Sequence, residues 1–419
     1  MTTNSTSRHV IVIGGGVIGV SCAYFLMRAG WRVTLVERGQ VGHGSSHGNC
    51  GLVCPSHVLP LAEPGMVAHG IKSLFQRNSP FAIKPRLDPA LWSWLLHFAA
   101  RCNERDMIDA GHGIQPLLLS SMALYQDLVK GESLDCEFET RGLLFAYRSK
   151  EGMQSYAATD RLMGEAFHCP ARQYDGDALL ELEPALRPGL AGGWYYHDDA
   201  HLRPDKLMLA WRRVLEAGGT TIRENCAFQG FRCKNGRALV ANTAEGELAA
   251  DMFIVAAGAW TPLLNDHLGC RVPIQPGKGY SLTMPRPTVC PKVPLIFPET
   301  RVAVTPFQSG YRLGSTMEFA GYDESIRAER LQLLRDGATG YLKEPYCEPV
   351  LEEWFGWRPM TYDSLPVIDR SPKHENVMIA AGHNMLGLSM APATGKLVAE
   401  MIGGASPHID PRPYRASRF

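Results

Sequence analysis

A glycine turn between an apolar strand and a helix, close to the N-terminus, constrains this chain more than any other feature. Residues 10–13 are apolar and β-branched, as in a strand that is buried on both faces. The pattern Gly14-x-Gly16-x-x-Gly19 follows at once, and the next apolar strand ends in Glu37. In a dinucleotide-binding unit these glycines allow the tight turn, the approach of a pyrophosphate and close helix packing, and the acid binds a ribose hydroxyl. The pattern therefore predicts a dinucleotide site; a purely structural glycine turn is the alternative.

The composition limits the class of protein. With 419 residues, 45% of them hydrophobic and 20% charged, the chain suits a soluble globular protein of two domains. Lys+Arg and Asp+Glu both number 42, so nothing favours a nucleic-acid partner, which requires a basic face. No apolar run of about 18 residues predicts a transmembrane helix, and the polar residues 1–7 lack an apolar signal core. We therefore expect a cytoplasmic location.

The eleven cysteines form no recognisable set of metal ligands. Cys50 and Cys54 are separated by three residues, and no second cysteine pair or histidine pair completes a zinc site. An odd number of cysteines without a secretory signal favours reduced thiols. We therefore expect no bound metal.

The segment after the glycine turn is rich in glycine and small hydroxyl residues. In 38–52 they predict backbone that passes close to a ligand, with a flexible surface loop as the alternative. Residues 53–86 contain several prolines and are expected to be irregular. Asp88 and Pro89 then begin an apolar helix that contains Trp92. A buried helix is favoured, and a surface for membrane or partner contact is the alternative.

The rest of the chain alternates between helical and strand patterns. Helices are predicted at 111–130, 151–166, 204–217 and 323–341 and from Gly387 to about Met401, and strands at 142–147, 220–223, 252–258, 280–284, 301–305, 311–316 and 377–381, with a hairpin at 234–236. The order predicts an α/β fold, in which a Rossmann-type domain carries an inserted α+β domain built on a mixed, mainly antiparallel sheet. We assign 1–86, 190–268 and 350–419 to the dinucleotide-binding domain, and 87–189 and 269–349 to a substrate-binding domain.

Four separated motifs resemble those of a known group of flavoenzymes. They are the glycine turn with Glu37, the segment Ser45-Ser46-His-Gly-Asn49-Cys-Gly51, the strand that ends at Gly258-Ala-Trp260, and Gly-Trp-Arg358-Pro together with Gly382-His383. In this order they resemble the FAD-dependent D-amino acid oxidase and glycine oxidase superfamily over nearly the whole chain. The segment after Glu37 is most similar to that of the bacterial D-amino acid dehydrogenases. The resemblance implies bound FAD and a small amino-acid substrate.

The resemblance also implies that FAD is bound in an extended form by three separate segments. The implied positions are Gly14, Gly16, Val17, Ile18 and Gly19 for the pyrophosphate; Glu37, Arg38 and Phe228 for the adenosine; Gly44, Ser45, Ser46, Ala257, Gly258 and Trp260 for the phosphate and ribityl oxygens; and Asn49, Gly51, Leu52, Arg358, Gly382, His383, Gly387, Leu388 and Ser389 around the isoalloxazine. N–H groups at the last three would stabilise the negative charge of a reduced flavin. Related sarcosine oxidases attach their flavin to a C-terminal cysteine, and Cys347 is not in the matching setting. We therefore expect noncovalent FAD.

Amino-acid oxidation requires a fixed anchor that holds the substrate Cα over flavin N5. The planar fork of an arginine binds a carboxylate through two parallel hydrogen bonds, and the resemblance places Arg358 in that role. A surface arginine in a salt bridge is the alternative. Tyr280 is a candidate second anchor or a packing residue, Met317 a candidate pocket wall, and His57 and His383 candidates for substrate contact or for structural roles. No paired-carboxylate or Ser/His/Asp site is expected.

Together these assignments predict an enzyme of amino-acid catabolism, an FAD-dependent D-amino acid dehydrogenase. It would deaminate D-amino acids to 2-oxo acids and ammonia by hydride transfer from Cα to flavin N5. The alternatives are oxidation of a secondary amine or imino acid (D-proline, hydroxy-D-proline, sarcosine or glycine) and a non-catalytic electron-relay subunit. An NAD-dependent dehydrogenase is disfavoured because one glycine turn serves one dinucleotide. Oxygen, a quinone or another carrier would reoxidise the flavin, and the Trp92 helix is compatible with peripheral contact to the inner membrane.

Overall fold

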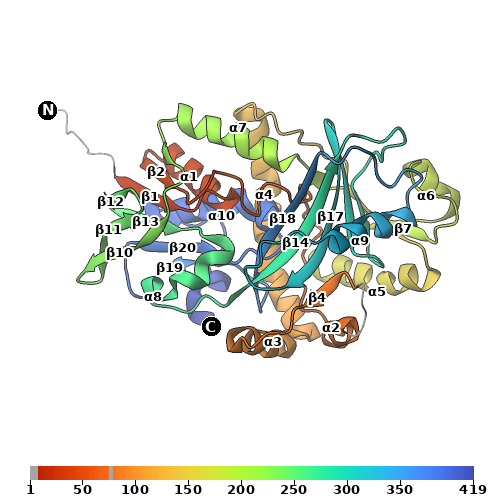
Figure 1. Ribbon diagram of the computed structural model, residues 1–419, viewed down its shortest axis with the longest axis horizontal. Coiled ribbons are helices and arrows are strands. Elements are labelled where there is room, and N and C mark those ends of the chain that lie inside the picture. Colours follow the sequence, from red (N-terminus) through yellow and green to blue (C-terminus); the bar gives the residue numbers. More distant parts are fainter. Residues whose placement is uncertain (1–7, 75–78) are drawn as a thin grey trace.

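Two large sheets lie side by side along the longest axis of the molecule, with helices packed around them (Figure 1). The computed structural model describes residues 8–74 and 79–419. The polar segment 1–7, which we expected to lack a signal core, and part of the irregular segment, 75–78, lie outside the described residues.

The first sheet carries the glycine turn and has six strands, in the order β19–β20–β13–β1–β2–β9. The strands are β1 (His9–Ile13), β2 (Arg32–Val36), β9 (Thr221–Arg223), β13 (Met252–Val255), β19 (Val367–Arg370) and β20 (Val377–Ala381). Strand β1 lies in the interior and pairs in parallel with β2 and β13. Its continuous apolar sequence follows from this position, because Val12 packs into one core and Ile13 into another on the opposite face.

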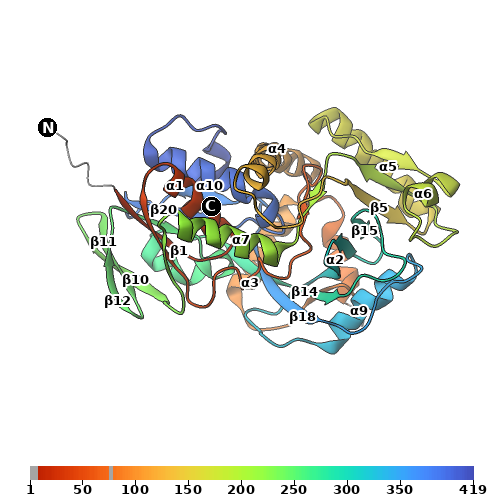
Figure 2. The same ribbon diagram turned by 90° about the horizontal axis from the view of Figure 1, so that it is seen from above.

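Helices cover one face of this sheet and a small sheet covers the other (Figure 2). The helices are α1 (Val17–Arg28), α4 (Glu104–Gly131), α7 (Pro204–Ala217) and α10 (Gly387–Gly403), and the small sheet consists of β10 (Phe228–Lys234), β11 (Arg237–Thr243) and β12 (Gly246–Ala249). The predicted hairpin between β10 and β11 is present, and both Asn235 and Gly236 have positive φ, as a two-residue turn requires.

The second sheet is mixed and mainly antiparallel. It has nine strands, in the order β18–β14–β17–β16–β15–β5–β7–β6, with β4 paired to β17. The strands are β4 (Phe81–Ile83), β5 (Leu143–Tyr147), β6 (Arg172–Tyr174), β7 (Gly192–Tyr196), β14 (Ile274–Met284), β15 (Leu295–Phe297), β16 (Val302–Phe307), β17 (Gly310–Phe319) and β18 (Glu352–Thr361). Only the pairs β15–β5 and β17–β4 are parallel in the described part of this sheet.

The remaining elements surround the second sheet or close the ends of the chain. They are α2 (Met66–Leu74), α3 (Pro89–Arg101), α5 (Lys150–Phe167), α6 (Gly176–Leu182), α8 (Asn265–Leu268) and α9 (Ala328–Thr339), the 3-10 helices at Gly258–Leu264, Arg412–Tyr414 and Ala416–Arg418, and the two-stranded ladder of β3 (Leu52–Val53) and β8 (Ala200–His201). The ladder ties the segment after the glycine turn to residues near the start of α7.

The structure differs from the sequence-based expectation in several places. Strands β4, β7 and β18 join the second sheet, although their segments were expected in the dinucleotide-binding domain. The segment 53–86 is not irregular throughout, because it contains α2 and β4 between its prolines. Helix α4 begins at Glu104, well before the predicted residue 111, and continues through Pro116.

Helix α3 is only half-buried, so the prediction of a buried helix is wrong for one of its faces. Asp88 caps it as predicted, with its side chain accepting a hydrogen bond from Leu91 N at 3.1 Å. Trp94 is buried, whereas Trp92 is 51% and Leu96 72% exposed. No helix in the described part of the chain is long and apolar enough to span a bilayer.

Candidate active site

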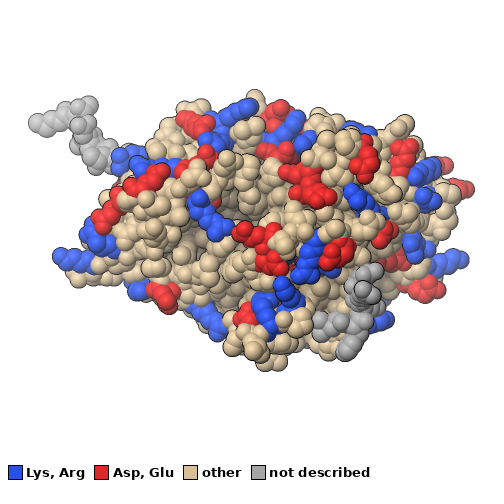
Figure 3. Space-filling view, viewed as in Figure 1, with Lys and Arg blue, Asp and Glu red and all other residues tan. Residues whose placement is uncertain are grey.

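A cavity of about 1170 Å³ is lined by residues from both large sheets. Pockets for small ligands usually measure about 300–1,000 Å³, so this one can hold an extended dinucleotide together with a small substrate. The face seen in Figure 3 has a hollow near its middle, and acidic and basic side chains alternate around it. The presence of both charges agrees with the equal numbers of basic and acidic residues in the sequence.

Nearly all of the predicted cofactor and substrate positions line this cavity. They are Gly14, Gly16, Val17, Ile18, Glu37, Arg38, Gly44, Ser45, Ser46, Asn49, Gly51, Leu52, His57, Phe228, Ala257, Gly258, Trp260, Tyr280, Met317, Arg358, His383, Gly387, Leu388 and Ser389. Gly19 and Gly382 are not among the lining residues. A Cβ atom at Gly19 would lie 1.8 Å from the carbonyl oxygen of Gly14, and one at Gly382 2.7 Å from Thr361 Cγ2. Both glycines therefore allow close packing behind the cavity wall.

The glycine turn places the N-terminus of α1 against the cavity. Ser46 Oγ accepts a hydrogen bond from Val17 N at 2.9 Å, so its hydroxyl lies at the positive end of the helix. The Glu37 carboxylate accepts from Gly15 N at 2.7 Å and from Gly39 N at 2.9 Å. These contacts hold the acid at the end of β2. A helix N-terminus of this kind suits a pyrophosphate.

Polar side chains fix the loop that continues from the turn. Asn49 Nδ2 donates to Ser46 O at 2.9 Å, and its Oδ1 accepts from Gly51 N at 2.7 Å. Nearby, the Arg38 guanidinium lies 3.8 Å from the centroid of the Trp260 ring, a cation–π contact. The loop is therefore held in one shape beside the cavity.

A second helix N-terminus, that of α10, faces the cavity. Within the described part of the chain no side chain caps α10, whose first turn consists of Gly387, Leu388 and Ser389. Ser389 Oγ donates to Leu52 O at 2.9 Å and so joins the start of α10 to β3. Unpaired N–H groups make such a helix end favourable for negative charge. The arrangement agrees with the implied position of the flavin's pyrimidine edge.

Both candidate histidines line the cavity in the neutral form. Burial lowers the pKa of His383 to about 3 and that of His57 to about 4. His383 Nε2 lies 3.0 Å from Thr394 Oγ1, and the His57 ring packs at 5.9 Å from the ring of Phe145. At neutral pH neither histidine carries the positive charge that would bind a carboxylate.

Arg358, on β18, is a half-buried cation in the cavity wall that has no acidic partner among the described residues. Its Nη1 donates to the carbonyl oxygen of Thr316 at 2.8 Å and lies 3.8 Å from Met317 Sδ. No carboxylate among the described residues acts on it, and burial lowers its pKa. A Cβ atom at Gly279 would lie 2.3 Å from Nη1, so this glycine makes room for the guanidinium. An anion from a ligand would compensate the buried charge.

Three buried polar atoms on the cavity wall have no hydrogen-bond partner among the described residues. They are Thr316 Oγ1, Trp357 Nε1 and His383 Nδ1. Buried polar groups are normally paired, so these atoms fit a polar ligand such as FAD or a substrate carboxylate. Ser315 and Thr316 also have positive φ, 113° and 54°. Such strain persists where the surrounding structure holds a ligand site in shape.

Tyr280 points away from Arg358. Its hydroxyl donates to Glu318 Oε2 at 2.8 Å, and Glu318 forms an ion pair with Arg327 at 3.1 Å. Side chains alternate along β14, so Tyr280 lies on the opposite face from Gly279, where the guanidinium is. The structure thus brings Met317 to Arg358, but not the Tyr280 hydroxyl.

We expect Tyr280→Phe to change the substrate KM by less than about threefold and to lower the free energy of unfolding by about 1 kcal/mol, because it removes one internal hydrogen bond. Steady-state kinetics and urea unfolding measure the two effects. Tyr414→Phe is the matched control, since that hydroxyl donates to Gly113 O at 2.7 Å in the core. A tenfold rise in KM for Tyr280→Phe alone would show instead that the hydroxyl reaches the substrate.

Sequence reasoning missed Thr316 and Gly279, which position the Arg358 guanidinium. A signal for Gly279 was present in the sequence, because Gly277 and Gly279 both interrupt a strand pattern. Glycines within a strand often mark a place where a ligand or another segment approaches the backbone closely. Thr316 had no signal in the sequence, since its contact is made by the backbone carbonyl.

Comparison with known proteins agrees with this geometry. The sequence pattern of the DAO family, described as FAD dependent oxidoreductase, matches residues 9–401. The chain is 32% identical to a D-amino acid dehydrogenase of Methylobacterium radiotolerans over 413 residues, 96% of this chain and 97% of that protein. Among solved structures it is similar to glycine oxidase from Geobacillus kaustophilus (TM-score 0.80, 21% identity, 99% and 100% of the two chains) and to iminodiacetate oxidase from a Chelativorans species (TM-score 0.71, 21% identity, 97% and 98%). The chain is thus an FAD-dependent oxidoreductase and belongs to the DAO family, as its four motifs predicted.

Proposed function

We propose that this enzyme oxidises D-amino acids to 2-oxo acids and ammonia. The observation that carries the proposal is the Arg358 guanidinium, which is half-buried in the cavity wall and has no acidic partner in the described residues. It suits a substrate that has a carboxylate next to the reacting carbon. The D-amino acid dehydrogenase of Methylobacterium radiotolerans, similar over nearly its whole length, supports the choice of substrate class.

The residues around Arg358 would bind and orient the substrate. Arg358 takes the carboxylate through parallel hydrogen bonds, and the unpaired Thr316 Oγ1 is free to bind the same group. His57 and His383 are neutral and do not compete with Arg358 for the carboxylate. Bound FAD supplies the acceptor for the hydride that leaves Cα. The N-terminus of α10 stabilises negative charge at that end of the cavity.

Substrate profiling tests this proposal. The purified enzyme is mixed without oxygen with D-alanine, D-phenylalanine, their L-forms, D-proline, sarcosine, glycine and iminodiacetate, and loss of the visible flavin absorbance is followed. We expect D-amino acids to bleach the flavin and L-forms not to. Bleaching by sarcosine, glycine or iminodiacetate alone would favour a secondary-amine or glycine oxidase, the activities named for two of the similar structures. No bleaching by any amine would favour a non-catalytic subunit.

The same substrates identify the electron acceptor when turnover is measured in parallel with a dye, a soluble quinone and oxygen. Turnover with the dye or quinone but not with oxygen would make the enzyme a dehydrogenase.

We expect FAD to be bound noncovalently. Cys50 and Cys54 line the cavity, and burial raises the pKa of both thiols, so they stay protonated and are poor nucleophiles. Precipitation of the protein with acid should therefore leave all yellow colour in the supernatant. Colour that stays with the polypeptide would show a covalent bond to the protein.

We also propose a cytoplasmic enzyme that contacts the inner membrane through α3. Trp92 and Leu96, one turn apart, are both exposed, and Leu87 precedes them at the surface. Burial of each large apolar side chain contributes about 1.5–3 kcal/mol, so Trp92→Ser with Leu96→Ser should weaken binding to phospholipid vesicles by about tenfold or more. Vesicle co-sedimentation measures this. Leu119→Ser with Leu209→Ser, exposed on α4 and α7, is the control; an equal loss there, or no binding by the wild type, would contradict the proposal.

A further inference from the structure

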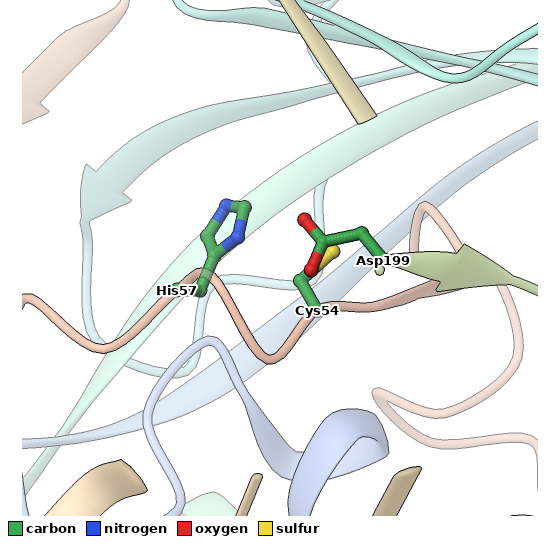
Figure 4. A group of neighbouring side chains, drawn as sticks. All are labelled: Cys54, His57 and Asp199. Atoms are coloured by element: carbon green, nitrogen blue, oxygen red, sulfur yellow. The ribbon is translucent and has the colours of Figure 1, made fainter. Parts of the chain in front are cut away.

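Three side chains of the metal-ligand type meet beside the cavity. Cys54 Sγ, a ring nitrogen of His57 and a carboxylate oxygen of Asp199 all lie within 4.8 Å of one another (Figure 4). Thiolate, imidazole and carboxylate together are ligands that zinc takes in proteins. We propose that these three residues bind a zinc ion whose fourth position opens to the substrate cavity. The proposal goes beyond the oxidation of D-amino acids and does not depend on it.

The backbone brings the three residues together although Asp199 is distant in sequence. In the ladder of β3 and β8, Leu52 is opposite His201 and Val53 is opposite Ala200. Cys54 directly follows the end of β3 and Asp199 directly precedes β8, so the same antiparallel register brings them opposite each other. His57 N then donates to Cys54 O at 3.2 Å, and the turn that this bond closes brings His57 back beside Cys54 and Asp199.

Ser56 orients two of the ligands. Its N–H donates to Asp199 Oδ1 at 3.0 Å and its hydroxyl to Asp199 Oδ2 at 2.5 Å, which fixes the carboxylate. Each carboxylate oxygen retains a further lone pair that can bind a metal. Ser56 Oγ also lies 3.4 Å from His57 Nδ1 and so contacts the imidazole ring as well. Residues that hold ligands in this way are typical of real metal sites.

The position of the cluster suits an ion held at the cavity wall. Cys54 and Asp199 are each 1% exposed, and Cys54 and His57 line the cavity while Asp199 lies behind them. Four ligands complete the usual coordination of zinc, and three protein ligands leave one position for water or a ligand in the cavity. On binding, zinc replaces the thiol proton of Cys54, and that proton leaves to the solvent. An occupied site would narrow the substrate cavity and inhibit oxidation.

Equilibrium dialysis of the FAD-loaded enzyme against zinc buffers, followed by metal analysis, tests the site. We expect the wild type to retain one zinc ion per chain, and Cys54→Ser and His57→Gln to lose most of it. Ser56→Ala, which changes no ligand, should weaken zinc binding by about 10- to 100-fold, as is usual when an orienting residue is removed. Cadmium should give a thiolate charge-transfer band in the ultraviolet that Cys54→Ser abolishes.

Cys233→Ser is the matched control, because Cys233 is exposed and its Sγ lies 3.5 Å from His374 Nε2, a pair that could also attract zinc. It should keep the bound zinc and the cadmium band. Retained FAD shows that each variant is folded. The proposal fails if the folded wild type retains no zinc, if Cys54→Ser retains as much as the wild type, or if Cys233→Ser alone loses it.

Discussion

Arg358→Ala is expected to raise the substrate KM by about two orders of magnitude, because a charged bidentate contact contributes about 2–4 kcal/mol. The thermal stability of the free enzyme should stay the same or rise, since the mutation removes a buried cation that no acid in the described residues compensates. Anaerobic flavin reduction over a range of substrate concentrations measures the first effect, and thermal unfolding the second. A higher KM without a loss of thermal stability distinguishes a lost substrate contact from a damaged fold.

Two further variants sharpen this test. Arg358→Lys keeps the charge but loses the planar fork, so we expect a KM between those of the wild type and Arg358→Ala. Arg327→Ala removes a partly exposed arginine that pairs with Glu318, and it should leave KM unchanged. If Arg358→Ala had the KM of the wild type, and bound carboxylate inhibitors as tightly, Arg358 would not be the anchor.

Alanine substitutions at the three glycines of the turn are expected to have two different effects. Two of them should lower the free energy of unfolding, and the third should lower the affinity for FAD. At Gly14, which has a φ of +110°, a Cβ atom would lie 2.4 Å from the carbonyl oxygen of Ala256. At Gly19 it would lie 1.8 Å from the carbonyl oxygen of Gly14. Because backbone cannot move aside cheaply, both variants should lose about 3 kcal/mol or more of the free energy of unfolding.

Gly16→Ala is the control for this strain and a test of the cofactor site. Its nearest neighbour would be Ser46 Oγ at 3.6 Å, an ordinary contact, so the apoprotein should be as stable as the wild type. The new methyl group would occupy space at the helix N-terminus that the pyrophosphate needs, and FAD affinity should fall. Urea unfolding of the apoprotein and FAD titration measure the two quantities. Equal instability in all three variants would contradict this distinction.

The start of the first sheet could be predicted from the sequence because its signals are local. Residues 10–19 carry strand, turn and helix in one continuous pattern. The short motif around Arg358 led in the same way to the substrate anchor that we propose. Segments without such local signals were harder to assign from the sequence. The prolines of 53–86 concealed α2 and β4, whose short patterns give little periodicity. Strand β18 looked like part of the C-terminal segment, and only its pairing with β14 assigns it to the second sheet.

Contacts made by distant residues could not be predicted at all. The orientation of Tyr280 depends on the register of β14 with its neighbours, and a strand pattern alone does not tell which face meets the cavity. Cys54 and His57 are close in sequence, but Asp199 joins them only through the ladder of β3 and β8. Cysteine spacing does not reveal Asp199, so the three ligands that we propose for zinc could not be grouped from the sequence.

The order of strands in the first sheet has a consequence for synthesis of the chain. Strand β1 pairs with β13, which is translated much later, and the bond from His9 N to the Asp251 side chain joins residues 242 apart. Strand β13 in turn pairs with β20, near the C-terminus. One edge of β1 therefore stays open on the ribosome until most of the chain has emerged, and open edges favour aggregation. The glycine turn of the FAD site is translated long before β13, β20 and α10, and the site is complete only when these later elements have emerged.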